Sequence, residues 1–390
     1  MGESWSNVKE FEGFSLLGGP LHRLGRRLGL VRGATNTVAL GFALGVSLWA
    51  VLMALTLIEG NGHLVFSLSV IGANVRLLVV IPLFFLCEAW WDPRLPAFIG
   101  MIVRSGVVPG NAMPALESAI ARTIRWKDSW LAEAMCLLAA VVFSLLGPQL
   151  HLSGTTAAYD PSHAAKGAAL AGQWYWIVCL PFFRFLMFRW LWRLGLWFYF
   201  LWRVARLDLH LVPTHSDGAG GLGYLEIVHT HFAPLILAIS AIQAASLAED
   251  LSAGTAAFEA IYPALAIVLV VDAVLFLGPL LLFTPKLWAC RVKGLSDYME
   301  FAASYVSGFD RKWLGADAHL EPLLGTPDLQ SLADLGNSVN IVRNMRWVPV
   351  SVRMLRDFAV AALVPMVPLL LLKYPVAELA EKFLGRLSGL

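Results

Sequence analysis

Charged side chains are scarce in this chain of 390 residues, of which only 14% are Asp, Glu, Lys or Arg while 58% are hydrophobic. Soluble domains carry about 25% charged residues. This deficit, together with several long apolar runs, excludes an ordinary soluble protein and predicts an integral membrane protein. The net charge of +2 is too small to favour nucleic acid as a partner, so the placement of the charges matters more than their sum.

Cysteine is also scarce, and none of the four cysteines forms a CxxC pair: Cys87, Cys136, Cys179 and Cys290. All four lie in or beside apolar runs, which favours buried small hydrophobic residues over disulfides or zinc ligands. The N-terminal stretch is polar and basic and lacks the pattern of a signal peptide. No internal repeat is evident.

Apolar runs predict an all-α membrane protein with six or seven transmembrane helices. The six expected spans are 35–58, 67–91, 129–147, 173–206, 232–248 and 261–285, and the weaker seventh is 357–372. The chain then divides into a basic N-terminal segment (1–34), a transmembrane bundle (35–285) with helices in 92–128 and a loop at 207–231, a helical region (286–356), and a last span or re-entrant segment with a tail (357–390).

Every second loop between the predicted spans has almost no Lys or Arg, and this alternation predicts which side of the membrane each loop faces. With the N-terminus in the cytoplasm, residues 59–66 and 249–260 are external and carry no Lys or Arg, whereas 286–356 is internal and carries nine. This alternation requires 173–206 to be one helix of about 50 Å, the fourth, rather than two spans. Its inner half is expected to join a cytoplasmic helical collar.

Three charged residues are predicted at about the same depth in three different spans: Arg76, Arg184 and Asp272. Charges inside a membrane are costly, so each is a functional candidate. One reading is a structural ion pair of Asp272 with an arginine. The others are an anion site at the spare arginine and a proton relay through Asp272.

Further charges lie closer to the cytoplasmic side. Arg189 and Arg193 follow on the fourth helix and are expected to line the inner mouth of an anion path, while the stretch "LCEAWWDP" predicts an interfacial position for Glu88.

The stretch "LDLHLVPTHSDGAGGLGYL", residues 207–225, combines histidines, aspartates and glycines between two apolar runs. Five side chains in or just after it have the chemistry of metal ligands: His210, His215, Asp217, His229 and His231. No cofactor is predicted, but a divalent metal is an alternative. The glycines favour a tight turn, with an anion-binding nest of amides as the second reading.

This stretch and the later "TPDLQSLADLGNSVNIVRNMRWVPVS" resemble segments of uncharacterised multi-pass membrane proteins of bacteria. The resemblance covers about residues 180 to 370 and implies a bacterial inner membrane, without an activity, cofactor or substrate. It also suggests that the two segments pack together, with loop 207–225 on the helices of 326–347.

The function expected first is transport, by an oligomeric ion channel or small carrier with an anion-attracting midplane site. The expected partners are the lipid bilayer, further copies of the chain and a small ion or anionic ligand. A membrane-embedded enzyme that acts on a lipid or phosphorylated substrate at the cytoplasmic face, through His215, Asp217 and nearby arginines, is the alternative. A signalling or defence protein is a third.

Overall fold

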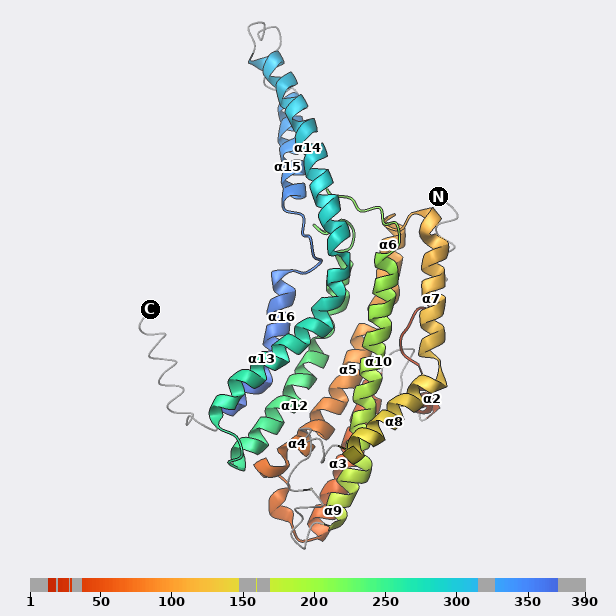
Figure 1. Cartoon of the computed structure of the whole chain (residues 1–390), viewed down its shortest axis with the longest axis vertical. Coiled ribbons are helices and arrows are strands. Elements are labelled where there is room, and N and C mark those ends of the chain that lie inside the picture. Colours follow the sequence, from red (N-terminus) through yellow and green to blue (C-terminus); the bar gives the residue numbers. More distant parts are fainter. Residues whose placement is uncertain are drawn as a thin grey trace, which may run out of the picture.

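The computed structural model describes residues 13–18, 20–27, 29, 37–146, 159, 169–314 and 327–370. Every regular element in this part of the chain is helical (Figure 1), which confirms the predicted all-α class. The expected external loop 148–172 lies mostly outside the described residues, and the tail after 370 lies entirely outside them.

Four helical runs are long and apolar enough to cross a membrane: Val38–Ile58, Leu68–Arg104, Tyr224–Ser252 and Phe258–Trp313. A fifth results if the helices Gly110–Lys127 and Trp130–Leu146, bent by 49°, form one broken span. The protein is therefore a multi-pass membrane protein. The expected count of six or seven spans is not confirmed within the described residues.

The helices follow one another in a simple order along the chain. Their bounds are α2 Pro20–Arg27, α3 Val38–Ile58, α4 Ile71–Asn74, α5 Ile81–Trp91, α6 Arg94–Arg104, α7 Met113–Lys127, α8 Trp130–Leu146, α9 Ala169–Trp174, α10 Leu180–Ala205, α11 Tyr224–Thr230, α12 Ala233–Ser252, α13 Ile261–Asp272, α14 Thr284–Trp313, α15 Pro327–Arg343 and α16 Val352–Leu363. Three π-helical segments join some of them: η3 Val75–Val80, η6 Tyr175–Cys179 and η8 Ala273–Leu277. Short 3-10 turns complete the described elements: η1 Gly62–Leu64, η2 Leu68–Val70, η4 Gly110–Ala112, η7 Phe258–Ala260, η9 Gly278–Phe283 and η10 Val364–Leu369.

The segment predicted as one long helix is continuous from Ala169 to Ala205, through α9, η6 and α10. It runs along the bundle from the lower end of Figure 1 to the upper end. This segment is not among the four runs that are apolar enough to cross a membrane, and α10 carries four arginines, at 184, 189, 193 and 203. The neighbours of α10 are α5, α7 and α8, so its charges face other helices.

Large aromatic side chains fill the place where α5, α10 and the start of α12 meet. The ring of Trp91 lies 6.0 Å from Trp190, 5.8 Å from Trp197 and 4.9 Å from Phe232, measured between centroids. All four are buried. Such aromatic pairs add to the packing energy of the buried area, so this cluster fixes the relative position of the three helices.

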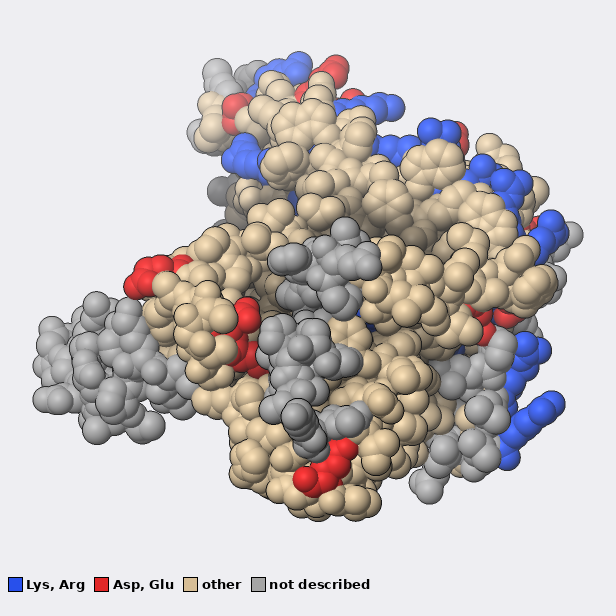
Figure 2. All heavy atoms as spheres, turned by 60° about the horizontal axis from the view of Figure 1, so that its bottom comes forward, with Lys and Arg blue, Asp and Glu red and all other residues tan. Residues whose placement is uncertain are grey.

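The two ends of the bundle differ in charge. The turns that join α3 to η2 and α12 to α13, at the lower end of Figure 1, contain Glu59 and Glu259, and Asp250 lies in the last turn of α12, but neither turn contains Lys or Arg. In Figure 2 this end shows mostly uncharged surface with a few acidic groups, while the basic side chains lie along the upper and right margins. We call the opposite end, with α6, α7 and the end of α10, the basic end.

Helices α14 and α15 form a hairpin that projects beyond the basic end (Figure 1). With 30 residues, α14 is about 45 Å long. Lys312 Nζ lies 2.8 Å from Asp328 Oδ2 and ties the far ends of the two helices together. Most of α14 packs on α15, and only Leu287 and Gly294 of it are buried, so the described residues do not confirm the expected collar.

The last predicted span corresponds to α16 and η10, which end at Leu369. These elements pack on α12, and Ser240 donates a hydrogen bond to the carbonyl of Ala362. Pro365 and Pro368 interrupt the regular hydrogen bonding at the end of this segment, which becomes a 3-10 turn. Within the described residues it is not among the helical runs that are long and apolar enough to cross a membrane.

Candidate functional site

Arg76 and Arg184 lie close together inside the bundle, and we call them the lower arginine pair. Arg76 is 2% exposed, and its Nη1 donates to the hydroxyl of Tyr175 at 2.7 Å. Arg184 is 7% exposed, and its Nη1 donates to the carbonyl of Phe143 at 2.7 Å. The charge of Arg76 acts on that of Arg184, so the two guanidinium groups belong to one site.

Arg184 has neutral surroundings. Among the described residues it forms no ion pair, and its one hydrogen bond goes to a backbone carbonyl. A guanidinium group has five N–H donors and keeps its charge even when buried. Burial of such a charge beside a second arginine is costly unless an anion or polar ligand compensates it.

Three π-helical segments interrupt the helices that carry the predicted midplane charges, and proline explains each of them. Pro82, Pro181 and Pro279 each follow two residues after a π segment ends. A proline inside a helix lacks the N–H for an i→i−4 bond and clashes with the preceding turn, so the turn widens. Arg76 lies in the first segment and Asp272 directly precedes the third, as is frequent for π segments at functional sites.

Asp272 does not pair with either arginine, so the structural ion pair considered from the sequence is absent. Both carboxylate oxygens are buried and have no hydrogen-bond partner among the described residues. The reason is lateral position: α13 packs on α12 and α16, whereas Arg184 lies on α10 beside α8. Equal depth in three spans does not bring side chains together.

A second group of charges, the upper ion cluster, comprises Glu88, Arg189, Arg193 and Glu133. Arg193 Nη1 donates to Glu88 Oε1, and Arg189 lies 3.8 Å from both Glu88 and Glu133. Arg189 also donates to the carbonyl of Gly18 at 2.8 Å. Glu88 is 3% exposed, so its carboxylate lies inside the bundle. Arg189 and Arg193 are likewise buried.

Hydrogen-bond donors exceed acceptors next to this cluster. Arg193 Nη2, Trp91 Nε1 and Trp190 Nε1 are buried and have no partner in the part of the chain that the structure describes. The Arg193 guanidinium lies 5.6 Å from the centroid of the Trp190 ring, and that ring lies 6.0 Å from Trp91. Buried groups of this kind ordinarily have a water molecule or an ion as partner.

Asp217 is the centre of the loop between α10 and α11. Its carboxylate accepts hydrogen bonds from the amides of Ala219 (2.8 Å), Gly221 (3.2 Å) and Gly223 (2.7 Å). Gly221 has a φ of +98°, a conformation that few other residues adopt. The amides expected as an anion nest are thus used by the chain itself, and the loop is an ordered turn.

The loop also contacts the segment after α15, as the resemblance suggested. Arg346 donates through its backbone amide to Gly218 O at 2.8 Å and through Nη2 to Asp217 O at 2.9 Å. Its Nη1 lies 2.6 Å from Glu226 Oε2, so the carboxylate that it neutralises belongs to α11 rather than to Asp217.

The candidate metal ligands of this region do not converge. His229 is buried on α11, accepts from Trp197 Nε1 at 3.1 Å and contacts Phe276 O at 2.7 Å. His231 bonds Ile227 O and Arg94, whereas His215 Nδ1 lies 2.9 Å from Asp217 Oδ1. Among the described residues no three His, Cys, Asp or Glu side chains, His210 included, form a group suited to a metal ion.

Asp217 predicts a dependence of stability on acid. Burial raises the pKa of its carboxyl, but the amides of Ala219, Gly223 and Gly221 outweigh this and hold the pKa below its usual value. The stabilisation is therefore present above about pH 4 and is lost as the pH falls through the lower, folded pKa. We expect Asp217→Ala to lower the free energy of unfolding at pH 7 by about 2–3 kcal/mol.

Thermal unfolding of the purified protein in detergent at pH 7 and pH 3.5 tests this prediction. The difference between wild type and Asp217→Ala should shrink at the lower pH. Asp208→Ala is the matched control, because Asp208 is exposed in the same loop. Equal melting temperatures for wild type and Asp217→Ala at pH 7 would contradict the structural role.

Comparisons with protein-family models, curated proteins and solved structures found no match for this chain. The chemistry of the site therefore has to be inferred from its geometry. Of the predicted residues, the structure brings Arg76 and Arg184 together and joins Arg189 to Arg193, while Asp272 lies apart.

Proposed function

We propose that the protein transports a small anion across a bacterial inner membrane, and that the lower arginine pair attracts the anion. The observation that carries the proposal is Arg184, a buried guanidinium beside Arg76 with no carboxylate among its described neighbours. A cation would be repelled at this point. An anion would gain a charge-assisted contact with Arg184 in a site that excludes most water.

The hydrogen-bond donors without a partner at the upper ion cluster also support an anion path through the bundle. Arg193 Nη2 and the two indole N–H groups beside it offer hydrogen bonds and need an acceptor. On the sequence of α10, Arg193 lies nine residues beyond Arg184, a rise of about 14 Å toward the basic end. In the proposal this end faces the cytoplasm, according to the positive-inside rule.

Flux of chloride or nitrate from liposomes that contain the purified protein tests the proposal. Arg184→Gln keeps the size and polarity of the side chain but removes its charge, and we expect the initial anion flux to fall at least about tenfold, equivalent to about 1.4 kcal/mol. Arg353→Gln, on the exposed side of α16, is the matched control and should transport like the wild type. Anion flux that is unchanged in both Arg184→Gln and Arg76→Gln, with both variants folded, would rule out the site.

A further inference from the structure

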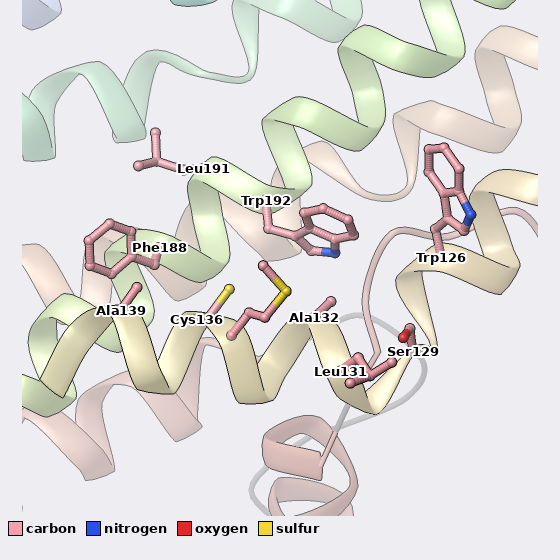
Figure 3. A pocket seen from close by; sticks show the side chains of 10 residues that line it. Trp126, Ser129, Leu131, Ala132, Cys136, Ala139, Phe188, Leu191 and Trp192 are labelled. Atoms are coloured by element: carbon pink, nitrogen blue, oxygen red, sulfur yellow. The ribbon is translucent and has the colours of Figure 1, made fainter. Parts of the chain in front are cut away.

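A groove of about 520 Å³ lies between α8 and α10. Figure 3 shows Cys136 of α8 and Trp192 of α10 directed into the space between the two helices. Small residues of α8, Ala132, Cys136 and Ala139, recur every three or four positions and create the hollow, and Phe188 lies on its opposite wall. The lining is almost wholly apolar.

The groove is open at its side. Leu131 and Met135 line it and remain 56% and 67% exposed. Apolar surface of this kind on a membrane helix faces lipid tails, which are the solvent there. An acyl chain is therefore the natural occupant of the space between the two helices.

Aromatic and basic residues continue both walls beyond the groove. Trp126 of α7 lines the groove, and Arg122 lies one helical turn before it on the same face of α7. On α10, Tyr199 comes seven residues after Trp192 and shares its face. The two walls meet there: the ring centroids of Trp126 and Tyr199 lie 4.7 Å apart, and Arg122 Nη1 donates to the Tyr199 hydroxyl at 3.4 Å.

The order along both walls is apolar, then tryptophan and tyrosine, then arginine, which is the order of layers in one membrane leaflet. Its length also fits. From Phe188 to Tyr199 the helix rises about 16 Å, and half of a hydrocarbon core of about 30 Å is about 15 Å. An acyl chain in the groove would thus place its phosphate beside Arg122.

We propose that this groove binds an anionic phospholipid of the leaflet at the basic end. The acyl chain occupies the groove, Trp126 and Tyr199 lie at the level of the glycerol backbone, and Arg122 contacts the phosphate. Further positive charge on the α10 side, from Arg206 stacked 3.9 Å from the centroid of Trp202, favours an anionic over a zwitterionic headgroup. The site is separate from the lower arginine pair and does not depend on transport.

Native mass spectrometry of the full chain, delipidated in mild detergent and titrated with phosphatidylglycerol or phosphatidylcholine, tests the proposal. We expect wild type to retain one phosphatidylglycerol at least about tenfold more tightly than phosphatidylcholine, equivalent to about 1.4 kcal/mol. Arg122→Gln, at an exposed position, should abolish this preference. Ala139→Phe fills the groove and should abolish retention of both lipids.

Leu138→Phe is the control for Ala139→Phe, because Leu138 is 63% exposed on the same helix and does not line the groove. It should bind phosphatidylglycerol like the wild type. Equal retention of the two lipids by the wild type would overturn the choice of an anionic headgroup. Phosphatidylglycerol binding that survives both Arg122→Gln and Ala139→Phe would overturn the site itself.

Discussion

Glu88→Ala is expected to lower the free energy of unfolding by about 3–5 kcal/mol, because it leaves buried guanidinium charge without its carboxylate. Glu88 is 3% exposed, bonds Arg193 and lies 3.8 Å from Arg189. Thermal unfolding in detergent, followed by tryptophan fluorescence, measures the loss.

A double-mutant cycle separates the interaction energy of the ion pair from the packing energy lost with the side chain. Removing both charges with Glu88→Gln and Arg193→Met should cost less than the sum of the two single changes, since each single change leaves one buried charge unpaired. Glu117→Ala, at an exposed position of α7, controls for loss of a carboxylate. Additive effects in the cycle would contradict a direct pair.

The sequence was sufficient to predict helices, because apolar runs and the spacing of Lys and Arg are local properties. The continuous helix through 173–206 follows from the same charge pattern, as do the basic and acidic ends of the bundle. Glycine and Asp217 indicated the turn at 207–225, and the structure supplies its physical basis in three amide bonds to one carboxylate. Each of these features depends on neighbours in the chain.

Lateral position could not be predicted, because it depends on which helices pack together. Counting residues gave Asp272 a depth similar to that of Arg184, yet the two side chains belong to different parts of the bundle. The π segments add to the difficulty. One extra residue in a turn rotates all later residues by about 100° about the helix axis. A helical wheel drawn for a regular α-helix therefore misplaces Glu88 relative to Arg76. The proline two residues after each segment was the available signal.

Gly45→Ala is expected to destabilise the bundle by about 3 kcal/mol, at the upper end of the usual cost of overpacking. A Cβ at this position would clash with the carbonyl oxygen of Leu77, and a Cβ at Gly41 would lie 2.7 Å from the Cβ of Phe85. Gly41 and Gly45 are four residues apart, the spacing by which membrane helices bring their backbones into contact. Because the clash is with backbone, no side-chain rotation relieves it.

Gly195→Ala is the matched control, since nothing lies within 4 Å of a Cβ built on Gly195 in the middle of α10. There the same substitution should stabilise the protein by up to about 1 kcal/mol through helix propensity. Opposite signs of the two melting-temperature shifts would show that close backbone contact, rather than glycine as such, is needed at position 45. A neutral Gly45→Ala would instead mean that η3 can move away from α3. Leu77 adjoins Arg76 in that segment, so such movement would also remove the constraint that holds the lower arginine pair beside Tyr175.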